Sequence, residues 1–343
     1  MFLFTFHRCC LQITFGLLLL LGSGAHLSLQ ADIIDTFGTG SNQFTMTFVP
    51  IGNPGNAADT TGDPNPAGSV AYNYNMGKYE VSRDMIIKAN AEGNLGITVP
   101  DMVNWYGIQG NGADQPIAGV SWNQAARYVN WLNTINGFSA AYKFALQPGQ
   151  PGYNSNANIE LWNGSDFGFN GSNPFRNSLA KYFLPSMDEW YKAAYYDPNA
   201  NGGKGGYWYY PTGSDTVPTP VSGGTTAGTA VYLQPYSQGP ADITNVGGLS
   251  PYGVMGMGGN AREWLETELD LVNNSPLASR VERGGAWHDI SSFILSASFR
   301  DNDPPFVNDR HIGFRVASIP EPSSAALLML GFVGLWQRRK RTS

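Results

Sequence analysis

Cysteine occurs only twice in this 343-residue chain, as the adjacent pair Cys9 and Cys10. Both lie in an apolar N-terminal segment that we expect to be removed. Without cysteine elsewhere, the mature chain can form no disulfide, bind no metal through thiolates and use no sulfur nucleophile. This absence constrains the chain more than any residue that is present.

The N-terminus has the pattern of a secretory signal. A weakly basic start precedes an apolar run over residues 11–21, and the small residues Ser23 and Ala25 suit a signal peptidase. Ala31 is a second candidate cleavage point. A short membrane anchor is the alternative, but the run is too short for a hydrocarbon core of about 30 Å. We therefore expect residues 1–31 to be a cleaved signal peptide.

The C-terminus combines three features in order. Pro-Glu-Pro at 320–322 precedes an apolar stretch over 325–336 and a basic cluster at 338–341. This order resembles the PEP-CTERM sorting signal of Gram-negative bacteria, and a simple tail anchor is the alternative. The resemblance implies a sorting tail at 320–343 with a short transmembrane segment, transient anchoring in the inner membrane and processing by an exosortase. It places the exported protein at the cell envelope or in the extracellular matrix.

The segment between these ends, residues 32–319, has the composition of an acidic, loop-rich domain. It contains 15 basic and 25 acidic residues, a net charge of −10, which argues against a nucleic-acid partner. No internal repeat or linker divides it. The 42 glycines of the chain predict long loops and sparse regular structure.

Three segments have a helical pattern, each with a serine at the N-cap. Short apolar runs elsewhere predict strands, so we expect a mixed α+β domain dominated by loops. The helices are expected at Arg83–Ala91 after Ser82, from Ser121 with Gln124 completing a capping box, and from Ser186 with Glu189 in the same role; the strands are expected at 44–49, 72–79 and 313–317.

Five further segments occur in an order that resembles the sulfatase-modifying-factor domain, the fold of the formylglycine-generating enzyme. The resemblance covers about residues 40 to 318 and implies a variant of the C-type lectin fold. The segments are NPGNAAD at 53–59 with MGKYEVS at 76–82, PIAGVSW at 116–122, FLPS at 183–186 before Glu189 and Trp190, MGGNAREW at 257–264, and RGGAW at 283–287 followed by Arg300 and GFR at 313–315.

Most of these motif residues favour structural roles over catalytic ones. Tryptophans supply much buried area, and arginines can centre buried ion pairs. We expect core anchors at Trp122, Trp131, Trp190 and Trp264, and buried ion pairs at Arg283, Arg300 and Arg315.

The family's known oxidation of a substrate cysteine uses copper held by two thiolates. In the resemblance these lie five residues apart, shortly before Arg300, at positions that Ser292 and Ala297 occupy here. Neither a hydroxyl nor a methyl group can hold Cu(I). Copper and the oxidase chemistry are therefore not expected.

Iron-dependent sulfoxide synthesis, a second activity on this fold, requires three histidines. Between the two ends the chain has only His288 and His311, besides His26 near the expected cleavage point. His288 beside Asp289 could act as a base with an orienting carboxylate, and a lone surface histidine is the alternative.

Calcium is the one family cofactor for which the chain retains candidate ligands. The resemblance implies the carbonyls of Gly256, Gly259 and Ala261 and the carboxylate of Glu263, an oxygen set that suits Ca²⁺. The family often has Asp or Asn where Gly256 stands, so one ligand is in doubt. The alternative is that Glu263 pairs with an arginine. A bound ion would pin loops and stabilise the fold.

These observations predict an exported, non-catalytic binding or structural module. The aromatic run 207–210 offers stacking faces for extracellular polysaccharide or peptide ligands, unless its rings fill the core. The alternative is an oxidoreductase-like or other enzyme with repurposed chemistry at Ser292, His288 or Asp289. A third possibility is a subunit whose partner is encoded elsewhere.

Overall fold

A computed structural model describes residues 31–320. The cysteine pair, the expected signal peptide up to residue 30 and the sorting tail beyond residue 320 lie outside the described residues. Across 31–320, no helix combines the length and the apolar character needed to cross a membrane. The predicted cleavage site and membrane segment therefore stay predictions.

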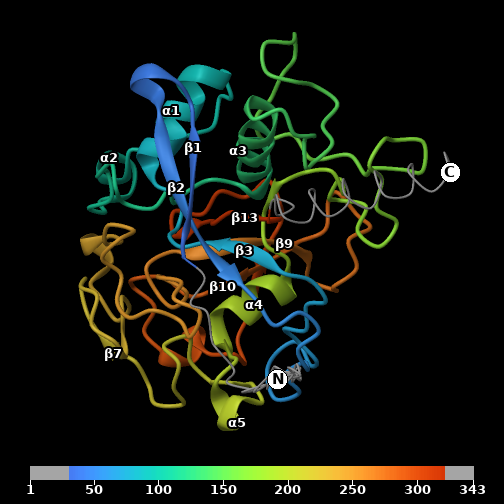
Figure 1. Cartoon of the computed structure of the whole chain (residues 1–343). Coiled ribbons are helices and arrows are strands. Elements are labelled where there is room, and N and C mark those ends of the chain that lie inside the picture. The colour runs from blue at the N-terminus through green and yellow to red at the C-terminus, as the bar shows by residue number, and fades with distance from the viewer. Residues whose placement is uncertain (1–30, 321–343) are drawn as a thin grey trace, which may run out of the picture. The chain divides into compact units, whose positions relative to one another are not determined.

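Two sheets form the framework of the domain (Figure 1). Neighbours in the larger sheet are antiparallel throughout, and in the smaller sheet only β12 and β9 are parallel. The larger sheet has the order β1 (Ile33–Phe37), β2 (Phe44–Ile51), β3 (Tyr74–Gly77), β13 (Ala317–Ser318) and β4 (Tyr182–Phe183). The smaller has the order β11 (Asp301–Asp303), β10 (Arg280–Arg283), β9 (Arg262–Glu268) and β12 (Ile312–Gly313).

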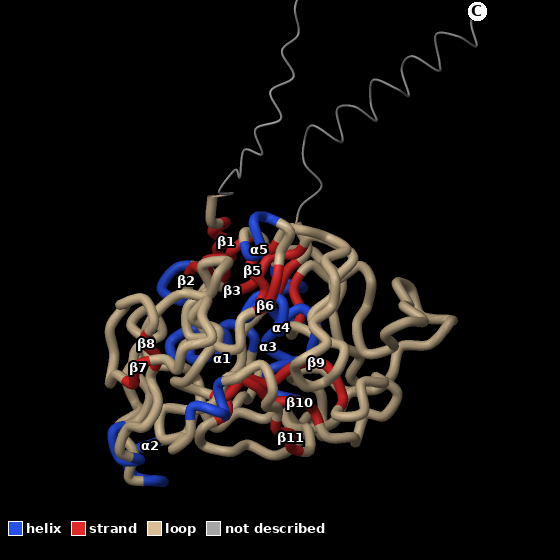
Figure 2. The backbone as a smooth tube through the Cα atoms, turned by 90° about the horizontal axis from the view of Figure 1, so that it is seen from below, coloured by secondary structure: helices blue, strands red, loops and turns tan. Residues whose placement is uncertain are grey.

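Short strand pairs, helices and long loops make up the rest of the described chain, and loops dominate in Figure 2. This mixed, loop-rich architecture confirms the predicted fold class. Two strand pairs are β5 (Tyr196–Asp197) with β6 (Gly206–Tyr207) and β7 (Thr219–Pro220) with β8 (Thr229–Ala230). The helices are α1 (Arg83–Gly93), α2 (Met102–Tyr106), α3 (Trp122–Ile135), α4 (Met187–Tyr195) and α5 (Ala200–Gly203), with 3₁₀ turns η1 (Gly40–Asn42), η2 (Tyr236–Gln238) and η3 (Ser292–Leu295).

The three predicted helix starts are confirmed as α1, α3 and α4. Ser82 accepts a hydrogen bond from the backbone N–H of Met85 at the start of α1. The capping boxes at Ser121 and Ser186 are both complete, with reciprocal bonds between the N-cap and the third helical residue. Local hydrogen bonding therefore fixes where each helix begins.

The predicted strand at 313–317 is wrong as a single element. The chain leaves the smaller sheet after Gly313 and joins the larger sheet at Ala317, so residues 314–316 cross between the two sheets. All three crossing residues are buried. A run of buried residues has the same apolar signature in a strand and in such a crossing, which explains the error.

The predicted tryptophan anchors are confirmed. Trp122, Trp190 and Trp264 are fully buried, and Trp131 is 6% exposed. The Trp122 and Trp264 indoles donate to backbone carbonyls at 2.8 and 2.9 Å, so their burial leaves no unpaired N–H group.

Candidate functional site

A buried ion pair joins the two sheets where the chain crosses between them. Arg315 donates from Nε and Nη2 to the two oxygens of Glu263 on β9, at 2.6 and 2.5 Å, and both side chains are fully buried. Its Nη1 reaches the carbonyl of Gly77 on β3 at 2.9 Å, while Trp190 Nε1 donates to Glu263 at 2.6 Å. The structure therefore contains the arginine pair that was the alternative to calcium at Glu263.

The predicted calcium ligands do not fit a cation site as arranged. Both oxygens of Glu263 already accept N–H donors, and a Cβ built on Gly256 would lie only 3.6 Å from the Arg315 guanidinium. Over the described range, no three His, Asp or Glu side chains are grouped to hold a metal ion. Calcium therefore stays a prediction that the donor set does not support.

A second buried carboxylate, Glu80, lies beside this pair. It accepts hydrogen bonds from Asn260 Nδ2 at 2.6 Å and from the backbone N–H of Ala261 at 3.1 Å. Burial, and then the negative charge of Glu263, raise the pKa of Glu80 to about 8. Both oxygens of Glu80 are thus occupied by N–H donors of the 260–261 segment, which ties this loop to the chain after β3.

Ser292 and Ala297, at which the resemblance would place the two thiolates, have different surroundings. Ser292 lies in η3, with its Oγ 3.4 Å from the hydroxyl of Tyr210. Ala297 is 3% exposed, and its carbonyl accepts bonds from the backbone N–H of Asp63 and from Arg283 Nη2, at 3.0 and 3.1 Å. Ala297 lines a cavity whose lining does not include Ser292, so the two positions do not share that cavity.

His288 and Asp289 do not form the suggested base pair. The Asp289 carboxylate accepts hydrogen bonds from the backbone N–H of Ala286 at 2.7 Å and from Arg262 Nη2 at 3.2 Å. His288 instead lies against His311, with ring centroids 5.3 Å apart, and its Nδ1 has no partner within residues 31–320. Burial is the main cause that lowers the pKa of His288. An orienting carboxylate is therefore missing from this histidine.

The cavity at Ala297 is the candidate functional site. Its volume is about 380 Å³, within the range of small-molecule sites. Aromatic rings and carboxylates alternate around it. The lining residues are Asp59, Thr61, Tyr207, Trp208, Tyr209, Asp215 and Ala297.

The aromatic wall is supplied by β6 and the turn that follows it. Trp208 is half-buried, with its indole N–H donating to Asp197 Oδ2 at 3.2 Å, and Tyr209 is 36% exposed. Asp215 accepts a hydrogen bond from the backbone N–H of Tyr209 at 2.9 Å, which closes the turn. Because these rings are only partly covered, the alternative that they fill the core is wrong for Trp208 and Tyr209.

The opposite wall is held by Asp59. Its Oδ1 accepts hydrogen bonds from the backbone N–H and the hydroxyl of Thr61, at 2.8 and 2.7 Å, and its Oδ2 accepts one from the Tyr191 hydroxyl at 2.6 Å. Behind the floor, the buried Arg283 donates to the carbonyls of Ala297 and Asp63. This arginine binds carbonyls, so the predicted ion pair is wrong there, whereas Arg300 pairs with Asp63 at 3.3 Å and is partly exposed.

Sequence reasoning found one side of this cavity and missed the other. The aromatic run 207–210 was recognisable from its composition. Asp59 and Thr61 were missed because no local pattern marks residues that face a loop about 150 positions away in the chain, and Asp215 was missed although it lies only six residues from Tyr209. The segment 53–59 was noticed only for its place in the family motif.

Two family models match the chain. Residues 37–319 match the sulfatase-modifying factor enzyme 1-like domain, and residues 318–341 match the PEP-CTERM protein-sorting motif. Among curated proteins there is no match.

Solved structures with similar folds include Treponema denticola variable protein 1 and CarF. The first has a TM-score of 0.56 at 18% identity, over 84% of this chain and 99% of that chain. The second has a TM-score of 0.54 at 18% identity, over 80% of this chain and 98% of that chain. At this identity the likeness concerns the fold alone, and the predicted relation to C-type lectins stays a prediction.

Proposed function

Because the chain belongs to the family of sulfatase-modifying factor enzyme 1-like domains and carries a PEP-CTERM motif, we propose that it is an exported, non-catalytic carbohydrate-binding module. The motif supports export and processing by exosortase-type machinery. We place the mature protein at the cell envelope or in the extracellular matrix, with any membrane anchoring confined to the tail before processing.

The observation that carries this proposal is the pairing of exposed aromatic faces with carboxylates in one cavity. Trp208 and Tyr209 can stack on the C–H face of a sugar ring, while the exposed carboxylate of Asp215 can accept a hydrogen bond from one of its hydroxyl groups. Two carboxylates and no cation favour a neutral, polyhydroxylated ligand over an acidic one. The cavity has room for one or two sugar rings rather than a folded partner.

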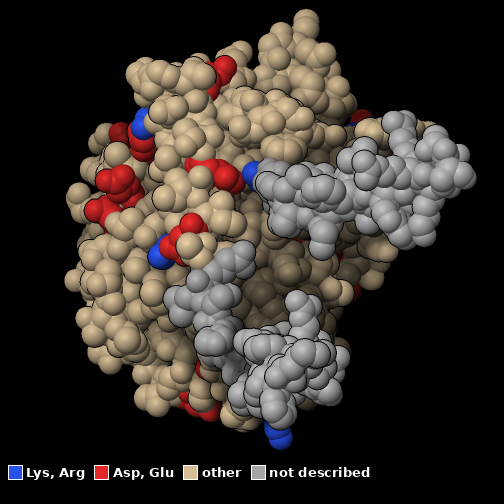
Figure 3. All heavy atoms as spheres, in the orientation of Figure 1, with Lys and Arg blue, Asp and Glu red and all other residues tan. Residues whose placement is uncertain are grey.

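The same cavity lacks the groups that the family's oxidation would need. Its floor is the methyl group of Ala297, and neither Ser292 nor His288 belongs to its lining. Acidic side chains, red in Figure 3, are spread more widely over the face shown than basic ones. That distribution agrees with the net charge of the domain and supports a partner other than nucleic acid.

The test is a binding measurement with the purified protein. We expect it to retain neutral polysaccharide in a pull-down and to show sugar-dependent perturbation in NMR titrations. Trp208→Ala should weaken binding by about threefold to tenfold, since stacking on one aromatic ring contributes roughly 0.5–1.5 kcal/mol beyond the area it buries. Trp105→Ala is the matched control, because Trp105 is a 59% exposed tryptophan on α2 outside the cavity.

Three results would count against the proposal. Failure to retain any neutral polymer would exclude neutral polysaccharide as the ligand. Equal binding by Trp208→Ala and wild type would exclude the cavity at Ala297 as the binding site. Turnover of a glycan, or oxidation of a cysteine peptide with copper and oxygen, would replace the binding role with the enzymatic alternative.

A further inference from the structure

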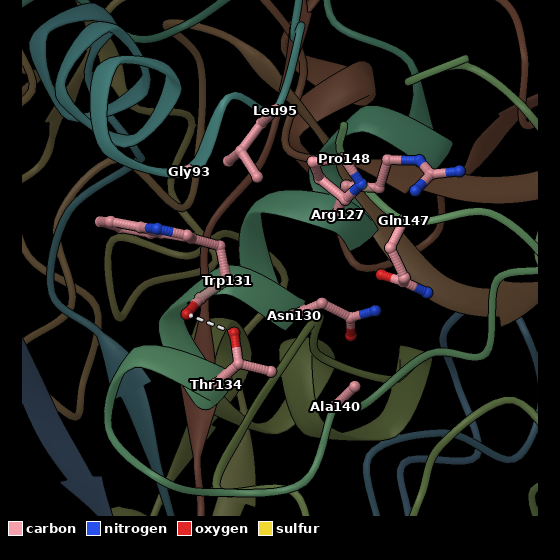
Figure 4. A pocket seen from close by; sticks show the side chains of 9 residues that line it. All are labelled: Gly93, Leu95, Arg127, Asn130, Trp131, Thr134, Ala140, Gln147 and Pro148. Carbon is pink, nitrogen blue, oxygen red and sulfur yellow. Dashed lines mark hydrogen bonds between the residues drawn. The ribbon is translucent and has the colours of Figure 1, made fainter. Parts of the chain in front are cut away.

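A second cavity, of about 240 Å³, lies on the side of the domain formed by α1 and α3. It is bordered by the end of α1, one face of α3 and the loop that follows α3 (Figure 4). Its lining shares no residue with the cavity at Ala297. An inference about it therefore does not rest on the proposed function.

The α3 side of this cavity follows from helical spacing. Arg127, Asn130, Trp131 and Thr134 stand at positions i, i+3, i+4 and i+7, which fall on one face of a helix. Figure 4 shows the Trp131 ring and the Arg127 guanidinium at opposite ends of this group, with Asn130 between them. The helix thus presents an aromatic end and a cationic end to the same space.

The aromatic end depends on a glycine. A Cβ built on Gly93 would lie 2.6 Å from Cδ1 of Trp131, so a larger residue at the end of α1 would displace the indole. Leu95 and Pro148 complete the apolar part of the lining. Thr134 is exposed, which marks the side of the cavity that is open to solvent.

The cationic end holds a charge without a counter-ion. Arg127 is only 4% exposed, and its Nε and Nη1 donate to the carbonyls of Ser155 and Leu146, both at 3.1 Å. The guanidinium carbon lies 3.8 Å from the ring centre of Phe144 and 4.6 Å from that of Tyr153. Over residues 31–320 no carboxylate pairs with this arginine. Burial lowers its pKa, but a guanidinium remains charged at neutral pH.

An unpaired, buried cation is unfavourable unless an anion reaches it. Neutral carbonyls and aromatic faces offset part of that cost, and an anionic ligand would offset the rest. The shape of the cavity limits the ligand, since 240 Å³ corresponds to about eight water molecules at ~30 Å³ each. A cavity of this size can hold a ligand with one six-membered ring but not an oligomer.

We propose that this cavity binds a small carboxylated sugar of the hexuronic acid class. The carboxylate pairs with the charge of Arg127 at Nη2, because Nε and Nη1 already donate to backbone carbonyls. The apolar face of the ring lies toward Trp131 and Leu95, and its hydroxyl groups meet the Thr134 hydroxyl and the Gln147 amide, both in the lining. The site selects for a negative charge, in contrast to the acidic cavity at Ala297.

The experiment is an NMR titration of the purified protein with D-glucuronate and with D-glucuronamide. The two ligands have the same ring and nearly the same size, but only the first has a carboxylate. We expect glucuronate to bind in the millimolar range, as is usual for so small a ligand, and at least tenfold more tightly than glucuronamide. Acetate, which lacks the ring, should also bind more weakly.

Substitutions at two positions, Arg127 and Ala140, locate the site by independent routes. Arg127→Gln removes the charge and should weaken glucuronate binding at least tenfold, while Arg127→Lys should recover part of it. Ala140→Leu fills the cavity from its wall without touching the arginine, and should also abolish binding. Arg310→Gln is the matched control, because Arg310 lies over the rings of Tyr106 and Tyr236, away from this cavity.

Equal affinity for glucuronate and glucuronamide would overturn the proposal, as would unchanged binding in Ala140→Leu. If Arg127→Gln fails to fold, the ligand pair and the Ala140 variant still decide it. Equally tight binding of acetate or of an acidic peptide would overturn the sugar class. None of these results tests the binding of neutral sugars at Trp208, so each proposal can be overturned without the other.

Discussion

Replacing Glu263 by glutamine separates the buried ion pair from the predicted calcium site. The glutamine keeps the shape of the side chain but leaves the Arg315 cation without its bidentate partner, in a place where both side chains are fully buried. Breaking a buried pair by removing one partner typically costs about 3–5 kcal/mol, because the remaining charge is uncompensated. For a domain of roughly 290 residues, an unfolding entropy of about 2.1 cal/mol/K per residue converts this to a loss of about 5–8 °C in Tm.

The assay is thermal and urea unfolding of wild type and Glu263→Gln, each with excess Ca²⁺ and with EDTA. If the ion pair is the stabilising element, the variant loses stability by the same amount in both conditions and wild type is insensitive to EDTA. A calcium site would behave differently, since a ligand that binds only the folded state raises its stability by mass action.

The exposed pair of Lys78 and Asp32 supplies the control. Its length of 2.7 Å is similar to that of the buried pair, but its side chains are 23% and 36% exposed. Asp32→Asn should therefore change stability by less than about 1 kcal/mol. The reasoning is refuted if Glu263→Gln costs no more than Asp32→Asn, or if EDTA lowers the Tm of wild type and Ca²⁺ restores it.

Two further substitutions test the buried framework. Lys192 is fully buried, and burial lowers its pKa from 10.5 to about 8. Between pH 8 and pH 10.5 the unfolded chain therefore binds a proton at this residue that the folded chain does not. The stability of wild type relative to Lys192→Met should therefore rise by about 2 kcal/mol from pH 7 to 9.5 in urea unfolding, and a pH-independent difference would contradict this. Gly259 has a φ of +86°, and a Cβ at this position would overlap the carbonyl of Val231. Gly259→Ala should therefore lower the free energy of unfolding by more than ~2 kcal/mol. Gly52→Ala is the control, because a Cβ there would lie in open space and should leave the stability nearly unchanged in the same assay.

The elements that the sequence predicted are those with local determinants. The capping boxes at Ser121 and Ser186 involve residues three apart, so their consequences can be seen in a short window. The tryptophan anchors were recognisable because few other environments suit so large a ring. The hairpin of β1 and β2 was missed in part, since β1 has only five residues and only its last residue, Phe37, is buried.

The cavity at Ala297 could not be predicted from any short stretch of sequence, because its lining residues come from distant parts of the chain. Asp59 and Trp208 are brought together by the packing of a loop after β2 against the turn after β6, far apart in the chain. The role of Glu263 also depended on a distant residue. The sequence allowed either a calcium ligand or a partner of an arginine, and that arginine, Arg315, is 52 residues away. The chemistry of a buried carboxylate indicates that Glu263 pairs with a metal ion or an arginine. The fold decides between them, because the crossing between the two sheets brings Arg315 to Glu263.

A domain with long loops and no cysteine in its described residues needs other links between distant segments, and buried arginines supply them. Arg176 donates to Glu266 on β9 at 2.8 Å and to both oxygens of Glu189 on α4 at 2.9 Å, so one side chain joins three segments. Glu189 in turn completes the capping box at Ser186. A disulfide acts largely by restricting the unfolded chain, whereas these contacts exist only in the folded one. Buried ion pairs of this kind therefore connect the segments of the described domain without any disulfide.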